Sequence, residues 1–436
     1  MNRSRIIVTA LVAAIGLIGC GEEKKPEPMK KTNVEAPPPP ATIDIKIGHV
    51  APLTGGIAHL GKDNENGARL AIDEANAAKI KIDGKEAKFT LIAEDDQADP
   101  KVGTTVAQKL VDAKVAGIVG HLNSGTTIPA SAIYNGANPP IPMITGSATN
   151  PKLTEQGFKN VFRVVGRDDQ QGPAIASYLA ATKKPKLVAV IDDATAYGEG
   201  IANEVEKTLK EAKIKVLPRE KGTDKTTDWK AVLTKLKGKR ADAVFYGGMD
   251  ATGGPLVKQG RELGMKAVFT FGDGACTDKM VELAGASAEG LLCSQAGIPP
   301  QAADKKFLED YKKKFNVDPI LYAPFTYDAA NLLIEAMKKA NSADPAKYLP
   351  ELAKIDYKGA TGKIAFDEKG DRKDAEMTIF TIKDGKLGPI AIIKGGQTIS
   401  YEDFIKASAP APAAAPAAEA PKAEPAKEAP KEAAKK

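Results

Sequence analysis

The sequence predicts two α/β domains built on parallel sheets. Segments with the alternation of strands take turns with segments whose apolar residues recur at helical spacing, which is the pattern of βαβ units. Residues 43–406 are more than the roughly 250–300 that one hydrophobic core usually serves, so two cores are expected. The composition, with 42% hydrophobic, 27% charged and 5% aromatic residues, is ordinary for a soluble globular chain.

The first group of elements alternates strand and helix. The first helical segment places three alanines and Ile72 on one face, and Pro100 suits the first turn of the second. The expected strands and helices are, in order, residues 43–50, 64–78, 89–93, 100–111 and 117–119.

The same rhythm returns in the second half of the chain. Such repetition implies parallel strands with right-handed crossovers and helices on both faces of the sheet. Ligands of these sheets bind outside the carboxyl ends of the strands, so the loops there are the candidate site. The expected elements, beginning with a strand and alternating with helices, are residues 187–191, 200–209, 214–217, 229–236, 243–246, 255–263 and 267–271.

The N-terminus has the features of a secretory signal. Arg3 and Arg5 precede an apolar stretch at 6–19, which is shorter than the roughly 20 residues of a membrane-spanning helix. Leu17-Ile18-Gly19-Cys20 looks like a bacterial lipobox, so we expect a signal peptide at 1–19 and a diacylglyceryl thioether on Cys20. The alternative is an ordinary signal peptide with a cysteine at its cleavage site.

Two segments are expected to lie outside the folded domains. Residues 20–42 are charged and contain four consecutive prolines, which predicts an extended linker. Residues 407–436 are almost wholly Ala, Pro, Lys and Glu, and they cannot bury enough apolar surface to offset their ordering entropy. We therefore predict a disordered tail. The formal net charge of +6 is small and spread along the chain, so it gives no support for nucleic-acid binding.

Once Cys20 is lipidated, two cysteines remain, Cys276 and Cys293. An exported chain meets an oxidising environment, in which these two could pair. Two separate buried thiols are the alternative, because spacing alone does not place their Cα atoms within bonding range.

Small polar residues fill the loops after the predicted strands. Ser124 lies just before a helix N-terminus, and Ser147 and Thr149 follow another short strand. Hydroxyls, free amides and a helix dipole suit a carboxylate. Tyr197 and Asp273 occupy later loops, where an aspartate could face an ammonium group. Each residue taken singly is also explained as a helix cap or turn residue.

Catalytic motifs are missing from the sequence. It contains no HExxH, GxSxG, Walker lysine or CxxC pattern, and its glycine-rich segment at 247–254 lacks the Gly-Lys-Ser/Thr ending. His121 lies three residues before Ser124, but a hydrolase would also need an orienting carboxylate and an oxyanion hole. We therefore predict that the chain is not an enzyme and uses no cofactor or metal.

The chain resembles the leucine/isoleucine/valine-binding proteins of bacterial ABC importers from Ile43 to about Ile393. The resemblance is carried by Ile45-Lys46-Ile47-Gly48, Gly120-His121-Leu122 with Ser124, Pro129-Ala130-Ser131, Met143-Ile144-Thr145, Asp169-Gln170-Gln171-Gly172-Pro173, Tyr197-Gly198-Glu199-Gly200, Tyr246-Gly247-Gly248, Ser287-Ala288-Glu289-Gly290-Leu291-Leu292 and Asp367-Glu368-Lys369-Gly370-Asp371.

This resemblance implies a type I periplasmic-binding fold, in which two doubly wound α/β lobes close on a ligand about a three-segment hinge. The implied crossings lie near 165–167, near Ala296 and near 375–377. Lobe 1 would then comprise 43–165 with 297–375, and lobe 2 would comprise 166–296 with 376–406. The implied partners are a small amino acid, the permease subunits of an ABC transporter, and the membrane through the lipid at Cys20. We expect a periplasmic or otherwise extracytoplasmic monomer.

The resemblance also implies the residues of the binding site. The ligand carboxylate would be held by Ser124, Ser147 and Thr149, and the ammonium group by the Ser147 carbonyl, Thr149 and Asp273. The remaining positions that match the family's site are Leu60, Leu122, Asn123, Ala148, Tyr197, Met249 and Tyr322.

Three departures from the family bear on the ligand. Asp273 stands where glutamate is frequent and is one methylene shorter, so water could mediate its contact. Met249 and Leu60 replace aromatic residues, which would widen the side-chain subsite or repack it. The disulfide that a relative has between the positions of Ala98 and Asn123 is absent. Branched aliphatic amino acids are the first choice of ligand, and an amide, urea or an aromatic acid is the alternative.

Two other functions share this fold or its outline. A ligand-sensing protein for an amide or other small solute would need a transmembrane helix or a cytoplasmic partner. A structural lipoprotein with a degenerate pocket would bind nothing, so substitutions of Ser124 and Asp273 would be silent.

Overall fold

Six strands form the first of two large sheets in the computed structural model, which describes residues 41–408. Their order is β2-β3-β1-β4-β5-β6, and all neighbours pair in parallel except β2 with β3. The strands are β1 (Thr42–Ala51), β2 (Lys81–Ile82), β3 (Lys85–Asp95), β4 (Gly117–Gly120), β5 (Met143–Thr145) and β6 (Val161–Arg163).

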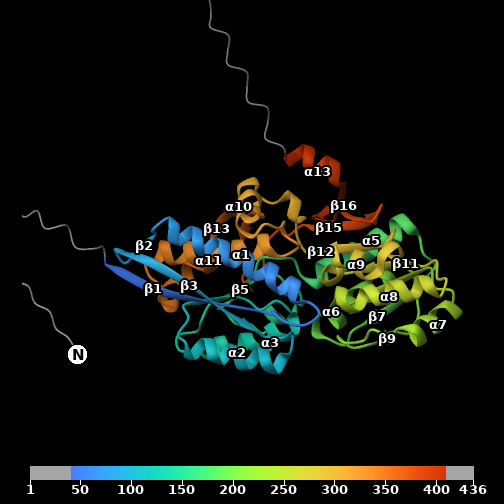
Figure 1. The fold of residues 1–436 in the computed structure, drawn as a ribbon, viewed down its shortest axis with the longest axis horizontal. Helices are drawn as coiled ribbons and strands as arrows, with labels where there is room; N and C mark the ends of the chain where they lie inside the picture. Colours follow the sequence, from blue (N-terminus) through green and yellow to red (C-terminus); the bar gives the residue numbers. More distant parts are fainter. Residues whose placement is uncertain (1–40, 409–436) are drawn as a thin grey trace, which may run out of the picture. The chain divides into compact units, whose positions relative to one another are not determined.

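Helices cover both faces of this sheet because its central strands send apolar side chains to both sides. Ile47 of β1 packs in one core cluster with α1 (Ala58–Ala77) and α11 (Ala323–Ala340). Val50 packs on the other face with α2 (Pro100–Asp112) and α3 (Ser124–Gly136). Figure 1 shows these two helix layers on either side of β1 and β3. We call this sheet and the elements packed on it the first lobe.

Apart from α4, which precedes β6, the rest of the first lobe comes from later in the sequence. Helix α12 packs on α11, and the hairpin of β13 and β14 also contacts α11. These elements are α4 (Lys152–Glu155), η3 (Pro300–Ala302), α10 (Lys305–Phe315), α12 (Pro345–Ala353), β13 (Asp356–Gly359) and β14 (Gly362–Ala365).

Nine strands form the second sheet, in the order β17-β16-β15-β12-β11-β10-β7-β8, with β9 also paired to β7. The strands from β7 to β12 pair in parallel, whereas β15, β16 and β17 extend the sheet in antiparallel fashion. They are β7 (Leu187–Asp192), β8 (Lys215–Val216), β9 (Glu220–Lys221), β10 (Ala243–Gly247), β11 (Val268–Phe271), β12 (Leu292–Gln295), β15 (Met377–Lys383), β16 (Lys386–Lys394) and β17 (Gln397–Ser400).

Strand alternation again fixes the layers of this second lobe. Val188 and Val190 of β7 pack against α5 (Asp168–Lys183) and α6 (Ala196–Glu211). Ala189 and Ile191 point the other way, toward the cluster under α7 and α8. The remaining elements of this lobe are α7 (Lys230–Gly238), α8 (Asp250–Glu262), η1 (Asp273–Ala275), α9 (Lys279–Ala284), η2 (Gly285–Ala288) and α13 (Tyr401–Ser408).

The predicted α/β fold is confirmed, with differences at several element boundaries. The antiparallel strands β15 to β17 were not predicted, so the second sheet is mixed rather than parallel. Helix α1 begins at Ala58 instead of Asn64, because the polar residues of its first turns are buried against tertiary partners. Helix α8 begins at Asp250 and holds Pro255 in its interior. Its Gly254 reflects close packing, since a Cβ there would lie 2.4 Å from the Leu283 Cβ.

Three chain segments connect the lobes and contact one another. The Gly166 N–H donates to the Ala296 carbonyl at 2.9 Å, and the Thr378 hydroxyl donates to the Gly297 carbonyl at 2.6 Å. Beside them, Arg163 is fully buried and pairs with Asp371, its Nε lying 2.8 Å from Oδ1. The expected crossings near 165–167, Ala296 and 375–377 therefore lie together.

The ends of the described region differ slightly from the prediction. Strand β1 already includes Thr42, which was predicted as linker, because Thr42 continues the parallel pairing with β3. Helix α13 continues through Ala407 and Ser408, which were predicted as tail, and its Phe404 packs against a core cluster. The predicted signal peptide, Cys20 and most of the tail lie outside the described residues. Within 41–408, no helix is both long and apolar enough to span a bilayer.

Buried His49 makes the stability of the first lobe sensitive to acid. Burial lowers the pKa of His49 to about 4, and its Nδ1 lies 3.0 Å from the Val119 carbonyl oxygen. The unfolded chain binds the proton at its ordinary pKa near 6.5, so this contribution to stability is lost as pH falls from about 6.5 to about 4. It amounts to about 3 kcal/mol.

We expect His49→Gln to remove this part of the pH dependence. The free energy of unfolding of wild type minus that of the variant should fall between pH 7 and pH 4.5, as measured by denaturant titration. Taking this difference cancels the contributions of Asp193 and Asp328 to the pH dependence. Burial raises the pKa values of these two acids to about 6, so their contributions to stability increase as pH falls, opposite to that of His49. Equal pH slopes for the two proteins would contradict the assignment.

Candidate ligand-binding site

A small cavity lies between the two lobes, at the carboxyl ends of their parallel strands. Each lobe contributes loops that follow a strand, as expected for ligand sites in open α/β sheets. The lining residues are Leu122, Asn123, Ser124, Ser147, Tyr197, Met249, Asp273, Gly274 and Tyr322.

The first lobe contributes hydroxyls and a helix N-terminus to this cavity. Ser124 is the first residue of α3, and its Oγ accepts from the Asn150 N–H at 3.2 Å. Ser147 follows β5, and its Oγ lies 3.4 Å from the Asn64 Nδ2. Both side chains are almost wholly buried. The positive end of the helix dipole and the hydroxyls together favour a carboxylate.

The second lobe contributes a buried acid held by two tyrosines. The Tyr197 hydroxyl donates to Asp273 Oδ1 at 2.7 Å, and the Tyr322 hydroxyl donates to Oδ2 at 2.8 Å. Burial raises the pKa of Asp273, while these two hydrogen bonds favour its ionised form. Burial also raises the pKa values of Tyr197 and Tyr322 well above their ordinary value, so both hydroxyls remain donors.

Tyr322 is positioned by a carboxylate from a different helix. Asp63 of α1 is buried and accepts the backbone N–H groups of residues 320–323, at 2.7 Å for Tyr322 itself. The same carboxylate accepts from the Tyr311 hydroxyl at 3.1 Å. Asp63 therefore caps α11 from outside that helix and fixes the tyrosine that reaches Asp273.

Eight of the eleven expected site residues line the cavity, and three do not. Ala148 packs in the first-lobe cluster with Val50, and its carbonyl accepts from Arg163. Leu60 does not line the cavity but belongs to the core cluster that contains the lining residues Leu122, Met249 and Tyr322. Thr149 is buried beside the cavity, and its hydroxyl has no hydrogen-bond partner among residues 41–408.

Sequence reasoning missed a second buried acid near the cavity. Asp168 is the first residue of α5, and its N–H donates to the Thr149 carbonyl at 2.9 Å. Neither oxygen of its carboxylate has a hydrogen-bond partner within the described part of the chain. Burial raises the pKa of Asp168, the nearby Thr149 hydroxyl partly offsets this, and the charge of Asp273 raises the pKa further. The pair Asp168-Asp169 at a helix start was the signal in the sequence, but it equally fits an ordinary cap.

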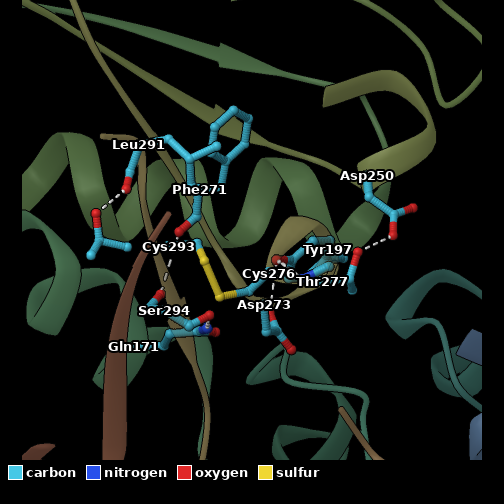
Figure 2. The surroundings of a disulfide bond; sticks show 12 residues. Gln171, Tyr197, Asp250, Phe271, Asp273, Cys276, Thr277, Leu291, Cys293 and Ser294 are labelled. Carbon is cyan, nitrogen blue, oxygen red and sulfur yellow. Dashed lines mark hydrogen bonds between the residues drawn. A yellow bond between two sulfur atoms is a disulfide. The ribbon is translucent and has the colours of Figure 1, made fainter. Parts of the chain in front are cut away.

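The two remaining cysteines form a disulfide next to the acid. Cys276 and Cys293 are bonded, and Cys276 follows the short helix η1 that begins with Asp273. Figure 2 shows the disulfide with Asp273, Tyr197 and Thr277 around it. Of the two states that the sequence left open, the structure has the paired one.

A sequence model of the family described as periplasmic binding protein matches residues 44–386. The chain belongs to this family. Its members are solute-binding proteins rather than enzymes, so the predicted absence of catalysis and the predicted extracytoplasmic location agree with the family.

Similar proteins of known name point to one group within the family. The chain is 36% identical to the leucine-, isoleucine-, valine-, threonine-, and alanine-binding protein of Pseudomonas aeruginosa, over 78% of this chain and 90% of that protein. It is 37% identical to Leu/Ile/Val-binding protein homolog 1 of Brucella suis, over 80% of this chain and 93% of that protein.

Solved structures of this group share the fold. The leucine-binding protein LivK of Thermotoga maritima superimposes with a TM-score of 0.74 at 30% identity, over 80% of this chain and 99% of that one. The branched-chain amino acid transporter substrate binding protein LivJ of Streptococcus pneumoniae, solved with isoleucine, has a TM-score of 0.72 at 29% identity, over 81% of this chain and 100% of that one. The predicted resemblance and the type I periplasmic-binding fold are thereby confirmed.

Proposed function

We propose that this solute-binding protein captures leucine, isoleucine, valine or a related small amino acid between its lobes and delivers it to the permease of an ABC importer. One observation carries the proposal: the cavity places hydroxyls and a helix N-terminus on one side and a buried acid on the other. These two ends complement the carboxylate and ammonium group of a zwitterion. The relatives' names add that such proteins bind branched-chain amino acids.

The roles of the residues follow from their chemistry. Ser124, Ser147 and Thr149 would donate to the ligand carboxylate, and Asp273 would accept from the ammonium group. Each charge-assisted hydrogen bond is worth about 1.5–3 kcal/mol. Asn123, Ala148 and Tyr197 support these ends through backbone and hydroxyl groups.

The side chain of the ligand would lie against apolar residues. Leu122, Met249 and Tyr322 line the cavity, and Leu60 packs directly behind them. Burial of one aliphatic side chain contributes about 1.5–3 kcal/mol. Asp273 favours a ligand with a cationic group, which counts against simple amides and acids.

The transporter would recognise the closed form of the two lobes. We propose lobe boundaries at 43–165 with 297–375 and at 166–296 with 376–406, so that the three contacting crossings form the hinge. A ligand shifts the open–closed equilibrium only by its higher affinity for the closed form. The Asp273–Tyr322 hydrogen bond joins the two lobes, so a ligand that engages Asp273 acts where the lobes meet.

The anchor and assembly are also proposals. We propose a monomer held at the membrane by lipid on Cys20, because two acyl chains give stable attachment. Mass spectrometry of the protein extracted from its native membrane should show a lipidated Cys20 as the first residue. An unmodified N-terminal cysteine would rule out the anchor.

The function is tested by thermal unfolding of the purified chain, freed of carried-over ligand by unfolding and refolding. Each of the twenty amino acids and several amides is added in turn. Ligand at a hundred times its dissociation constant stabilises the folded protein by about 2.7 kcal/mol and raises the midpoint. Shifts with leucine, isoleucine and valine would support the proposal, and added shifts with threonine and alanine would widen the specificity. Shifts with amides alone would favour a sensor, and no shift at all would refute amino-acid capture.

A further inference from the structure

The turn that carries Asp273 is pinned at both ends to one residue of the neighbouring strand. Before the turn, Phe271 is the parallel-register partner of Cys293 in the pairing of β11 with β12. After the turn, Cys276 is covalently bonded to the same Cys293. Residues 272–275, with Asp273 among them, therefore form a small closed loop on β12. Figure 2 shows Phe271, Asp273 and the disulfide that closes it.

Few backbone hydrogen bonds hold this turn in place within the described part of the chain. The register of β11 with β12 extends over only two residue pairs and ends at Phe271. Within the turn, the Cys276 N–H donates to the Asp273 carbonyl at 2.8 Å, and the Gly274 N–H donates to the Tyr197 hydroxyl at 3.1 Å. A carboxylate that must meet two hydroxyls and a ligand needs a fixed backbone. The disulfide is the covalent bond between the end of this turn and the neighbouring strand.

The residue after the disulfide takes part in a contact between the lobes. The Thr277 hydroxyl donates to Asp250 Oδ2 at 2.6 Å, and the same oxygen lies 2.7 Å from Nε2 of His59. His59 lies on α1 of the first lobe, whereas Asp250 begins α8 of the second. One short segment, 273–277, thus bears the ligand acid, the disulfide and a closing contact.

Both cysteines are buried, which distinguishes this disulfide from an exposed redox switch. Cys276 is 1% exposed and Cys293 is 0% exposed, and both lie in the core cluster of the second lobe. Soluble thiols therefore have no direct access to either sulfur in the folded protein. The geometry points to a constraint on position.

We propose that the Cys276–Cys293 disulfide is a positioning device for the binding site: it fixes the Asp273 turn and thereby sets the affinity for the ligand. The inference rests on the proposed function for its ligand, but the fixed turn itself can be tested without one. A disulfide that only stabilised the lobe would affect unfolding without acting through Asp273.

The test compares the double variant Cys276→Ala/Cys293→Ala with wild type in the full chain. Leu233→Ala is the matched control, because Leu233 is fully buried in the same core cluster but lies on α7, outside the turn. Hydrogen exchange is measured on ligand-free protein, and leucine binding is measured by calorimetry. We expect faster exchange at residues 272–277 and a rise in the leucine Kd of about tenfold in the double variant. The control should show neither change.

A second arm repeats the cysteine substitutions in an Asp273→Asn background, with leucine at high concentration. If the disulfide acts through Asp273, its loss should raise the Kd there by less than about twofold. Equal factors in both backgrounds, an unchanged leucine Kd, or unchanged exchange in the turn would each overturn the proposal. If wild type does not bind leucine, the proposed ligand is wrong, and the exchange measurement alone then decides whether the disulfide fixes the turn.

Discussion

Replacing Asp63 with alanine is expected to destabilise the protein by at least 3 kcal/mol. The substitution removes the acceptor of four backbone N–H groups at residues 320–323 and of the Tyr311 hydroxyl. A buried donor left without a partner costs about 1–3 kcal/mol, and partial entry of water offsets some of the sum. Burial raises the pKa of Asp63, so part of its own desolvation cost is recovered. The free energy of unfolding is therefore still expected to decrease substantially.

Denaturant unfolding followed by circular dichroism measures this effect. Asp112→Ala is the matched control, because Asp112 is exposed at the end of α2 and, among residues 41–408, accepts only from the Gln108 side chain. It should change stability by about 0.5 kcal/mol or less. Since Asp63 also holds the backbone of Tyr322, leucine binding should weaken in Asp63→Ala at temperatures where the variant remains folded. A variant as stable as the control would show that the helix α11 start needs no such cap.

Asp63 also illustrates which features of the fold were beyond sequence reasoning. Local caps can be predicted because a side chain bonds an N–H two or three residues later, as Asp99 does at the start of α2. Asp63 instead caps a helix that begins some 260 residues further along the chain. Its polar character made the first turns of α1 look like loop, so the predicted helix began too late.

The strand order and layers were predictable to the extent that periodicity encodes them. Val188 and Val190 alternate with Ala189 and Ile191, and because all four are apolar, the pattern predicts a strand covered on both faces. Strands β16 and β17 lacked such a signal, because β17 is wholly exposed and β16 is half-buried for much of its length. Strand β15 does carry it, since Ile379 packs in one cluster and Phe380 and Ile382 in the other, and it was overlooked.

The candidate site was predicted mainly by the resemblance to known binding proteins. Small hydroxyl residues after strands are ambiguous singly, and only the family pattern brought Ser124, Ser147 and Asp273 together. Periodicity says nothing of Asp168, whose position depends on how α5 leaves the hinge. Pairing of Cys276 with Cys293 was also undecidable, because it depends on β11 and β12 being neighbours.

Replacing Asp273 with alanine should abolish most ligand binding while leaving the fold intact. In the complex, a ligand ammonium group would remain buried without its acid, and the loss of one partner of a buried ion pair costs about 3–5 kcal/mol. We therefore expect the leucine Kd to rise by roughly 10²- to 10⁴-fold, as measured by calorimetry. The free protein should change little in net stability: the Tyr197 and Tyr322 hydroxyls lose their acceptor, but the cost of burying the Asp273 carboxylate, which raises its pKa, is recovered.

Two companion variants separate the charge from the shape of the site. Asp273→Asn keeps the size of the side chain but loses the charge, so it should weaken binding nearly as much. Tyr197→Phe keeps the carboxylate and removes one hydroxyl donor, whose 2.7 Å bond to Asp273 favours the ionised form. It should cost about 1.5–3 kcal/mol at most. If Asp273→Asn bound leucine as tightly as wild type, the ligand would need no acid, and the second lobe would recognise it by shape alone.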